Sequence, residues 1–385
     1  MRLAIITPRY GTEVFGGAER LAHSLAEQLA VRDYEIDIWT SCAKDYYTWE
    51  NVYDAGTTTV NNITVRRFPI THYNRSKFNE LSQLLIQQWG LSHLEQQEWF
   101  AAGAHSYALY EALSRQASQC DALLILPYQA VLAQAAAWIA PERTVLIPCL
   151  HNEPYAYLES ARLILEEVHG LLFLTPEEQS LACDQLKVRP KKQDVMGAAV
   201  SEPTNRPFRR DQSTSPYLLS MGRLEGGKNM ALLYEYMQRL ANEGSPLRLV
   251  LAGDGIFRPP AEPPFDLRGS VSEEEKLNLL AGAEALVHPS LNESFSLVLL
   301  EAWLAQCPVL VHKACPVTVG HVKRSQGGLA FATYGEFALA VRQIMSQPEQ
   351  AKQMGENGRN YVLQNYTWPI IIERLEQILA NWLGG

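Results

Sequence analysis

Apolar residues in the first half of the chain group into short continuous runs that alternate with stretches of helical periodicity. The run Leu3–Thr7 reads LAIIT and is followed by Pro8, a pattern typical of a buried parallel strand. Between residues 19 and 30, leucines recur every four residues, which predicts a helix with one apolar face. The segment 78–117 is predicted to be mostly helical. Similar apolar runs predict further strands at 34–40, 63–68, 122–126, 144–150, 171–175 and 194–200.

A polar segment, residues 201–216, separates this block from a second block with the same alternation. Its sequence, SEPTNRPFRRDQSTSP, holds three prolines among basic and polar residues, which predicts a linker. After it, strands are predicted at 217–221, 248–252, 285–289 and 309–312, and helices from about 228, from 272, after 292, from 335 and over 368–383.

Two consecutive blocks of this kind predict an α/β protein with two Rossmann-like, doubly wound parallel sheets. We expect an N-terminal domain over residues 1–200 and a C-terminal domain over residues 217–367. Ligands of such sheets bind at the carboxyl ends of the strands, so we expect the site in a cleft between the two domains.

Composition narrows the possible partners. A length of 385 residues and 47% hydrophobic residues suit two packed cores, at ~100–200 residues per domain. The net charge of −9 argues against nucleic acid and leaves, at most, peripheral contact with a membrane. The basic stretches at 66–77 and 187–192 are interpreted as solvated surface. The six cysteines lie far apart without metal-binding spacing, and no signal peptide or apolar run of ~18–20 residues is present, so we expect a cytoplasmic protein.

The densest chemical signal follows the strand predicted at 217–221. The sequence GRLEGGKN, residues 222–229, places the cations Arg223 and Lys228 five residues apart, with glycines between them, at a strand-to-helix junction. Glycines let a ligand approach the backbone, the helix start offers free N–H groups, and both cations suit phosphate oxygens. An ordinary loop with surface cations is the alternative.

A second signal follows the strand predicted at 285–289. Glu293 and Glu301 flank seven mostly apolar residues at the start of a helix. Carboxylates in this position suit paired hydrogen bonds to sugar and ribose hydroxyls, and the backbone N–H groups of 295–297 suit an anion. The alternative is that Glu293 caps the helix. For Glu301 a chance position is less plausible, because an unpaired carboxylate is costly to bury.

Three further features are weaker on their own. Gly253 ends the strand at 248–252, and Gly16 with Gly17 opens the first helix without a dinucleotide-binding pattern. A plain turn explains either equally well. His151 follows the strand at 144–150 and is expected at the rim of the cleft, where it could contact a sugar hydroxyl, although a lone histidine is more often structural.

Together these segments resemble the retaining GT-B glycosyltransferases of family 4 (glycosyl transferases group 1). GRLEGGKN is similar to the family's diphosphate motif, LAGDG to its glycine-rich strand end, and HPSLNESFSLVLLEAWLAQCPVL to its E-x7-E segment. FGGAERLAHSLAEQLA resembles its first glycine loop and helix. Two departures are Ser294 and Ser296, where many members have glycine, and Cys307, where glycine usually precedes the proline.

The resemblance implies a role for each matching residue. Arg223 and Lys228 would bind the diphosphate, Glu293 the transferred sugar, and Glu301 the ribose. His151 would contact the donor sugar. The remaining donor-binding residues implied are Gly16, Gly17, Gly222, Asn229, Gly253, Arg268, Val271, Ser294, Phe295, Ser296 and Leu297. The last helix, 368–385, would complete the N-terminal domain.

The activity implied is metal-independent transfer of a hexose with retention, without a cofactor, from a nucleotide diphosphate sugar to a saccharide or lipid-linked saccharide. UDP is the base we expect, with glucose as the sugar. A nucleotide-sugar epimerase, a phosphorylase and a non-catalytic nucleotide-sugar or glycan-binding protein remain alternatives, separable by product analysis without acceptor, by bound pyridoxal phosphate and by turnover on an acceptor panel.

Overall fold

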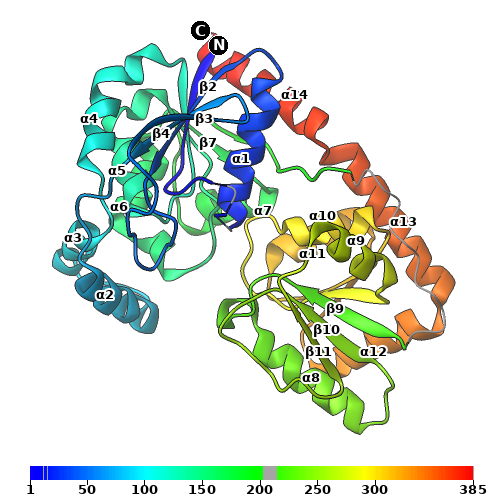
Figure 1. Ribbon diagram of the computed structural model, residues 1–385. Helices are drawn as coiled ribbons and strands as arrows, with labels where there is room; N and C mark the ends of the chain where they lie inside the picture. The colour runs from blue at the N-terminus through cyan, green and yellow to red at the C-terminus, as the bar shows by residue number, and fades with distance from the viewer. Residues whose placement is uncertain (12, 15, 203–214, 385) are drawn as a thin grey trace. The chain divides into compact units, whose positions relative to one another are not determined.

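The computed structural model describes residues 1–11, 13–14, 16–202 and 215–384, and they form two compact units (Figure 1). The first unit comprises Met1–Gly197 and the residues from Ile372 onward, and the second comprises Ala198–Ile371. Most of the predicted linker, residues 203–214, lies outside the described residues.

The first unit is built on an eight-stranded sheet with the order β3-β4-β2-β1-β5-β6-β7-β8. Side chains of successive residues point to opposite faces of a strand, so Ala4 and Ile6 share one face. There they join a buried cluster with residues of α4, α5 and α6, while α1 lies on the other face (Figure 1). The strands are β1 Arg2–Ile6, β2 Glu35–Ser41, β3 Gly56–Val60, β4 Ile63–Phe68, β5 Ala122–Ile125, β6 Thr144–Leu146, β7 Gly170–Phe173 and β8 Gln193–Val195.

Helices α1–α7 connect or cover the strands of this unit. They are α1 Gly17–Ala30, α2 Arg75–Gln88, α3 His93–Ala102, α4 Tyr107–Gln116, α5 Val131–Ile139, α6 Glu159–Glu167 and α7 Pro176–Ser180. A π-helical segment, Leu181–Gln185, continues α7, and short 3₁₀ segments occupy Ala117–Gln119, Pro141–Arg143 and Pro154–Tyr157.

The last helix, α14 (Trp368–Leu383), supplies part of the first unit from the far end of the sequence. The Trp382 ring packs on Gly170 so closely that a Cβ at that glycine would lie 2.3 Å from it. Lys192 Nζ donates to the Trp382 carbonyl oxygen at 2.5 Å, and Arg374 donates to the carbonyl of Met196 at 2.7 Å. Packing and hydrogen bonds therefore connect residues 170–196 to the C-terminal helix.

The second unit is a parallel six-stranded sheet with the order β11-β10-β9-β12-β13-β14. Helices α8 and α12 pack on one face in a second buried cluster, and α10 and α11 lie on the other (Figure 1). The strands are β9 Tyr217–Met221, β10 Arg248–Ala252, β11 Phe265–Gly269, β12 Ala285–His288, β13 Val309–His312 and β14 Gly328–Phe331. The helices are the 3₁₀ turn Gly226–Lys228, α8 Met230–Asn242, α9 Glu273–Gly282, α10 Leu297–Leu304, α11 Pro316–Ser325, α12 Tyr334–Ser346 and α13 Pro348–Asn365.

Both sheets are doubly wound, as predicted, but the sequence pattern missed several elements. β3 pairs antiparallel to β4 at the sheet edge, so the first sheet is not wholly parallel. Its sequence, GTTTV, is largely exposed and polar, and hydrophobic periodicity cannot detect such a strand. The pattern also gave no indication of β11, β14 or α11.

Three predicted boundaries were wrong. The strand predicted at 144–150 ends at Leu146, and the strand predicted at 194–200 ends at Val195. The helix expected soon after residue 292 begins only at Leu297, because Ser296 adopts a left-handed backbone conformation. Glu301 therefore lies about one turn into α10.

No helix in the described part of the chain is long and apolar enough to cross a membrane.

Candidate functional site

Two loops of the second unit meet where the strand order reverses. β9 and β12 are neighbours in the sheet, yet β9 connects onward to β10 on one side and β12 to β13 on the other. Loops that leave neighbouring strands in opposite directions open a crevice at the carboxyl ends, which is the usual ligand position in such sheets. Asn229 Nδ2 donates to the Pro289 carbonyl oxygen at 3.3 Å and joins the two loops.

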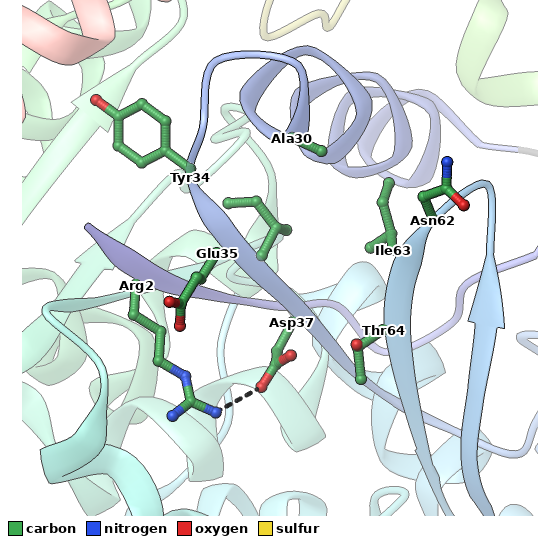
Figure 2. Close-up of a pocket in the computed structure, with 9 residues that line it drawn as sticks. Arg2, Ala30, Tyr34, Glu35, Asp37, Asn62, Ile63 and Thr64 are labelled. Carbon is green, nitrogen blue, oxygen red and sulfur yellow. Dashed lines mark hydrogen bonds and ion pairs between the residues drawn. The ribbon is translucent and has the colours of Figure 1, made fainter.

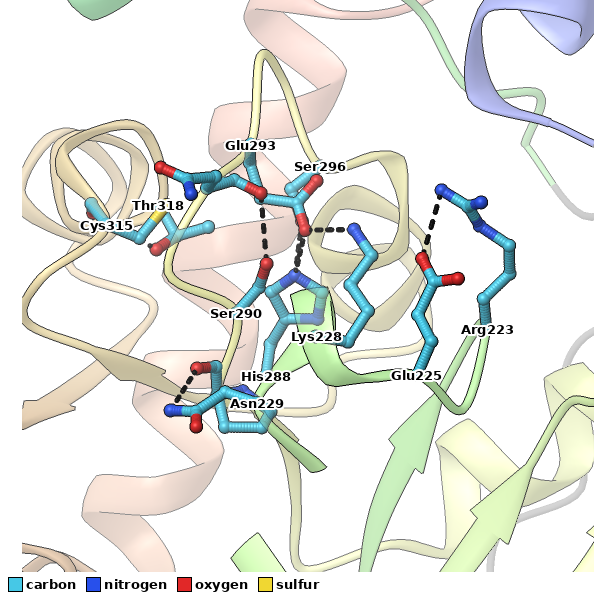
Figure 3. Close-up of polar contacts among 12 residues, drawn as sticks. Arg223, Glu225, Lys228, Asn229, His288, Ser290, Glu293, Ser296, Cys315 and Thr318 are labelled. Atoms are coloured by element: carbon cyan, nitrogen blue, oxygen red, sulfur yellow. Dashed lines mark hydrogen bonds and ion pairs between the residues drawn. The ribbon is translucent and has the colours of Figure 1, made fainter. Parts of the chain in front are cut away.

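Lys228 and Glu293 are in contact at this point (Figure 3). Lys228 Nζ lies 2.5 Å from Glu293 Oε1, and the two side chains are 25% and 10% exposed. Burial alone would raise the pKa of the Glu293 carboxyl, but Lys228 and His288 outweigh it and hold that pKa well below its ordinary value. The carboxylate is therefore charged over the whole physiological range.

Glycine backbones shape the floor of the site. Gly222 and Gly253, which directly follow β9 and β10, have φ angles of +123° and +135°. A Cβ at Gly253 would lie 1.9 Å from the Gly222 carbonyl oxygen, so the two loops touch backbone to backbone. Gly253 thus needs glycine for both its φ angle and its close contact, and Gly222 needs it for its φ angle.

Arg223 lies in the same loop as Lys228 but in a different environment. Its side chain is 66% exposed, and its Nη2 lies 3.3 Å from Glu225 Oε1. In Figure 3 the charged ends of Arg223 and Lys228 extend to the same side of the loop. The arginine is thus solvated and its position is adjustable, whereas the lysine is held by a buried partner.

Glu301 is buried and paired, as the cost of burying a lone carboxylate requires. Lys276 Nζ of α9 lies 2.9 Å from Glu301 Oε1, and both side chains are 12% exposed. Lys276 also approaches Glu273 at 2.6 Å. No sequence pattern singles out Lys276, because it lies 25 residues from its partner.

The start of α10 lies next to this cluster. Leu297 is its first residue, so the Leu297 N–H is one of the groups without a partner inside the helix. Phe295 is buried and packs against the rings of His321 and Tyr366, at 5.1 and 5.3 Å between ring centroids, so only its backbone can face a ligand. Ser294 lies between Glu293 and Phe295 and is partly buried.

Arg268 and Val271 belong to the edge of the same sheet. Arg268 lies in β11, and its Nε is 2.9 Å from Asp266 Oδ1 in the same strand. Val271 follows that strand and precedes α9. The side chain of Arg268 is thus engaged by Asp266, which leaves the backbone as the means by which this segment could contact a base.

In the first unit, His151 and its neighbours form a polar cluster beyond the carboxyl end of β6. Tyr128 Oη donates to Glu153 Oε1 at 3.0 Å, and Gln129 Nε2 donates to the same oxygen. His151 Nδ1 lies 3.6 Å from that oxygen, and its side chain is 29% exposed. Tyr128 and Gln129 follow β5, so two neighbouring strand ends supply the cluster.

A buried carboxylate fixes the loop that carries His151. Glu178 accepts hydrogen bonds from the backbone N–H groups of Leu150 and Leu174, each at 2.5 Å. Burial raises the pKa of Glu178 to about 8, although those N–H groups act in the opposite direction. The sequence Thr175-Pro176-Glu177-Glu178 is typical of a helix cap, and Thr175 Oγ1 does accept from the Glu178 N–H, but the pattern gave no sign of the longer link to Leu150.

An ion pair between Arg9 and Glu19 lies beside the glycine loop of the first unit, which Gly16 and Gly17 form. Gly16 is the N-cap of α1 and Gly17 its first residue. Arg9 donates to Glu19, whose carboxylate folds back over Gly16 so closely that a side chain there would collide with it. A side chain at position 16 would therefore force the Glu19 carboxylate to move.

A separate pocket lies at the amino ends of the strands of the first sheet (Figure 2). It has a volume of about 350 Å³ and is lined by the first residues of β1, β2 and β4. Asp37 binds Arg2 at 3.2 Å and Arg66 at 2.7 Å, so its charges are paired internally. Arg66, interpreted above as solvated, is in fact partly buried, and Arg67 is buried with Nη2 donating to Tyr10 O. The amino ends of parallel strands are not the usual ligand edge.

Comparisons with known proteins show similarity to glycosyltransferases over part of the sequence. Residues 201–361 match the model of a family described as glycosyl transferases group 1, and this interval holds the Lys228–Glu293 contact. A GDP-mannose-dependent alpha-(1-6)-phosphatidylinositol dimannoside mannosyltransferase of Mycobacterium tuberculosis is 29% identical over 161 residues, 40% of this chain and 41% of that protein. The chain spans at most about half the length of the curated relatives it matches, 34% and 41% for two of them.

Solved structures match over nearly the whole chain. Sucrose-phosphate synthase from Thermosynechococcus elongatus has a TM-score of 0.73 at 16% identity and covers 100% of this chain and 99% of its own. Anabaena HepE, solved in complex with UDP-glucose, has a TM-score of 0.71 at 16% identity, with 99% of this chain and 100% of its own covered. At such identities the likeness concerns the fold, and the predicted GT-B fold is confirmed.

Proposed function

We propose that the chain is a retaining glycosyltransferase of the glycosyl transferases group 1 family, whose model matches residues 201–361. It moves a hexose from a nucleoside diphosphate sugar to a saccharide or a lipid-linked saccharide. The observation that carries the proposal is the contact between Lys228 and Glu293 at the point where the strand order of the second sheet reverses. A cation for the diphosphate and a carboxylate for the sugar are thereby placed side by side.

The two cations receive the leaving group. When the bond between the anomeric carbon and the diphosphate oxygen breaks, its electron pair stays on that oxygen. Lys228 stabilises the new charge as a point charge, and Arg223 adds a planar fork of N–H donors. Arg223 is exposed and bound only to Glu225 among the described residues, so it can turn toward a bound diphosphate at little cost. The pair supplies the positive charge for which other transferases use a metal ion.

The two glutamates recognise the hydroxyl-bearing parts of the donor. Glu293 is ionised, and an ionised carboxylate can only accept hydrogen bonds, which suits the hydroxyls of the transferred sugar. Glu301 takes the ribose hydroxyls, and Lys276 holds its carboxylate in place. The other residues that border the donor are Gly222, Asn229, Gly253, Ser294, Ser296 and Leu297. Phe295, Arg268 and Val271 contribute through their backbone.

Retention follows from attack on the face that the diphosphate leaves. The acceptor oxygen bonds to the anomeric carbon of an oxocarbenium-like sugar, and its proton passes to the departing phosphate oxygen. No side chain is required as a nucleophile. We assign to His151 a contact with the donor sugar, and to Gly16 and Gly17 the room needed by phosphate and acceptor. His151 is suited to this because Glu178 fixes its loop and Glu153 lies beside its ring.

We propose UDP as the nucleotide and glucose as the sugar. The UDP-glucose complex of Anabaena HepE supports this choice, whereas the mycobacterial relative is named for GDP-mannose. We also expect action in the cytoplasm with at most peripheral membrane contact, because all six cysteines are unpaired.

A thermal-shift panel tests the proposal. UDP, GDP and ADP and their glucose or mannose derivatives are each added to the protein, and we expect the UDP compounds to raise the melting temperature. A ligand at 100 times its Kd adds ~2.7 kcal/mol, which is readily detected. The same panel is applied to Lys228→Met, with Lys352→Met as a matched control on the distant helix α13. No shift with any nucleotide, or equal shifts in both variants, would reject the proposal.

A further inference from the structure

His288, the last residue of β12, was assigned no role by the sequence, yet it contacts the central carboxylate of the site. Its Nε2 lies 2.8 Å from Glu293 Oε1, and the two side chains are only 6% and 10% exposed (Figure 3). Because the ionised carboxylate can only accept, His288 must carry its proton on Nε2. His288 therefore donates to Glu293 from the end of β12, whereas Lys228 donates from the loop after β9.

The two donors hold the same oxygen of the carboxylate. Lys228 Nζ and His288 Nε2 both contact Oε1, whereas Oε2 has no hydrogen-bond partner among the described residues. A carboxylate fixed through one oxygen keeps a defined direction for the other. Oε2 is thus the oxygen that can accept from a ligand hydroxyl.

Ser296 supports the histidine at a conformational cost. Its Oγ lies 3.3 Å from His288 Nε2, and the residue is buried. Its φ is +75°, a region in which any residue other than glycine is strained. Glycine at this position would relieve the strain but would remove the hydroxyl that faces His288. A strained serine retained beside a buried polar group points to a use for its side chain.

We propose that His288 and Ser296 are positioning residues that hold Glu293 Oε1 so that Oε2 binds a hydroxyl of the transferred sugar while Lys228 turns to the diphosphate. The proposal rests on the function inferred above and adds a division of labour to it. Lys228 contacts Glu293 in the free protein, so binding of a diphosphate weakens or breaks that contact. His288 is then the donor that keeps Glu293 in place.

This arrangement separates sugar recognition from diphosphate recognition. Loss of the histidine should impair binding and turnover of the nucleotide sugar but leave the affinity for the free nucleotide unchanged. A hydrogen bond to a charged group is worth a factor of about 10–100 in an equilibrium or a rate. A residue that only supports the fold would instead weaken both ligands together.

The experiment compares His288→Leu, His288→Gln and Ser296→Gly with the wild type, using UDP, UDP-glucose, GDP and GDP-mannose as probes. For the nucleotide sugar that binds, we expect kcat/KM to fall about 10–100-fold in His288→Leu. The Kd of the matching nucleotide should stay within about twofold. Gln restores most of the activity, since its amide can donate to Oε1. Ser296→Gly should keep or raise the melting temperature and still lower kcat/KM.

Outcomes that overturn the proposal are distinct from failure of the proposed function. Equal losses for nucleotide and nucleotide sugar, or unchanged kcat/KM in His288→Leu, refute the positioning role while leaving glycosyl transfer intact. ¹⁵N NMR of histidine-labelled protein, with the His288 signal assigned from His288→Gln, provides a test without any ligand. A protonated Nε2 supports the proposal, and a bare Nε2 refutes it even if no nucleotide binds.

Discussion

Replacing each of the two site cations by methionine should produce a loss of activity in both cases but a loss of stability in only one. Lys228→Met leaves the Glu293 carboxylate, 10% exposed, without its ammonium partner. Arg223→Met removes a guanidinium that is 66% exposed and bound to Glu225 at the surface. The two substitutions remove the same charge from the same loop. The difference between their losses of stability therefore measures the effect of burial.

The size of the difference follows from the contacts. Removing one partner of a fully buried pair costs about 3–5 kcal/mol, and an exposed pair is worth about 0–1 kcal/mol. Lys228 is a quarter exposed and His288 remains bound to Glu293, so we expect ~1–3 kcal/mol for Lys228→Met. For Arg223→Met we expect less than ~0.5 kcal/mol. At ~2–4 °C per kcal/mol, the melting temperatures should differ by several degrees.

The stability difference between wild type and Lys228→Met should also depend on pH, in a direction that the pKa of Glu293 determines. The pKa of Glu293 is lowered on folding, so its stabilising effect is present above its ordinary pKa of 4.5 and is lost as pH falls below it. The gap between wild type and Lys228→Met should therefore be full at pH 7 and should narrow under acid conditions. Lys313→Met is the matched control, because Lys313 also follows a strand of this sheet and binds a glutamate, Glu336, but at the surface.

The assays are calorimetry or denaturant unfolding for stability, and initial rates of sugar transfer for activity. Turnover should fall at least ~10²-fold in both variants, by analogy with removal of one oxyanion donor. Near-normal rates in both would contradict the role given to the cations. A melting temperature for Lys228→Met equal to that of Lys313→Met would show that the contact with Glu293 carries no stability, and the reasoning from burial would be wrong.

Three further predictions concern other parts of the site. Glu178→Gln should flatten the dependence of the unfolding free energy on pH. Folding raises the pKa of Glu178 to about 8, so its contribution to stability is complete below pH 4.5 and is lost as pH rises through 8. A pH dependence as steep as that of the wild type would contradict this. Gly253→Ala should unfold several degrees lower, since its Cβ would lie 1.9 Å from the Gly222 carbonyl, and an unchanged melting temperature would rule the contact out. Glu301→Gln should weaken UDP binding about tenfold and reduce the preference for UDP over 2′-deoxy-UDP in calorimetric titration; an unaltered preference would exclude the ribose role.

The sequence predicted the parts of the fold in which burial alone decides structure. β9, β10 and β13 have the predicted bounds because each is a continuous apolar run in the middle of a sheet. β3 was missed because edge pairing, which a single sequence does not display, holds its exposed threonines in place. The late start of α10 was missed for a related reason, since the left-handed conformation of Ser296 is a property of the folded loop.

The site was predictable where chemistry and spacing coincide. Arg223 and Lys228 could be selected because they flank glycines just after a strand, and Glu293 and Glu301 because carboxylates in a mostly apolar segment are costly to bury unpaired. His288 could not, because a histidine that ends a buried strand has the same appearance as any core residue. Lys276 and Glu178 were missed because their partners, Glu301 and the Leu150 N–H, are distant in sequence and become neighbours only in the fold.

The origin of the first unit's final helix has a consequence for synthesis on the ribosome. All residues of the second unit precede Ile372, whereas the first unit still lacks the turn that carries Trp382 when residue 371 is made. The first unit is thus finished last, and until then the surface of Gly170 that Trp382 covers stays exposed to chaperones and to aggregation. A premature stop after residue 371 would damage the half of the protein that had already been translated.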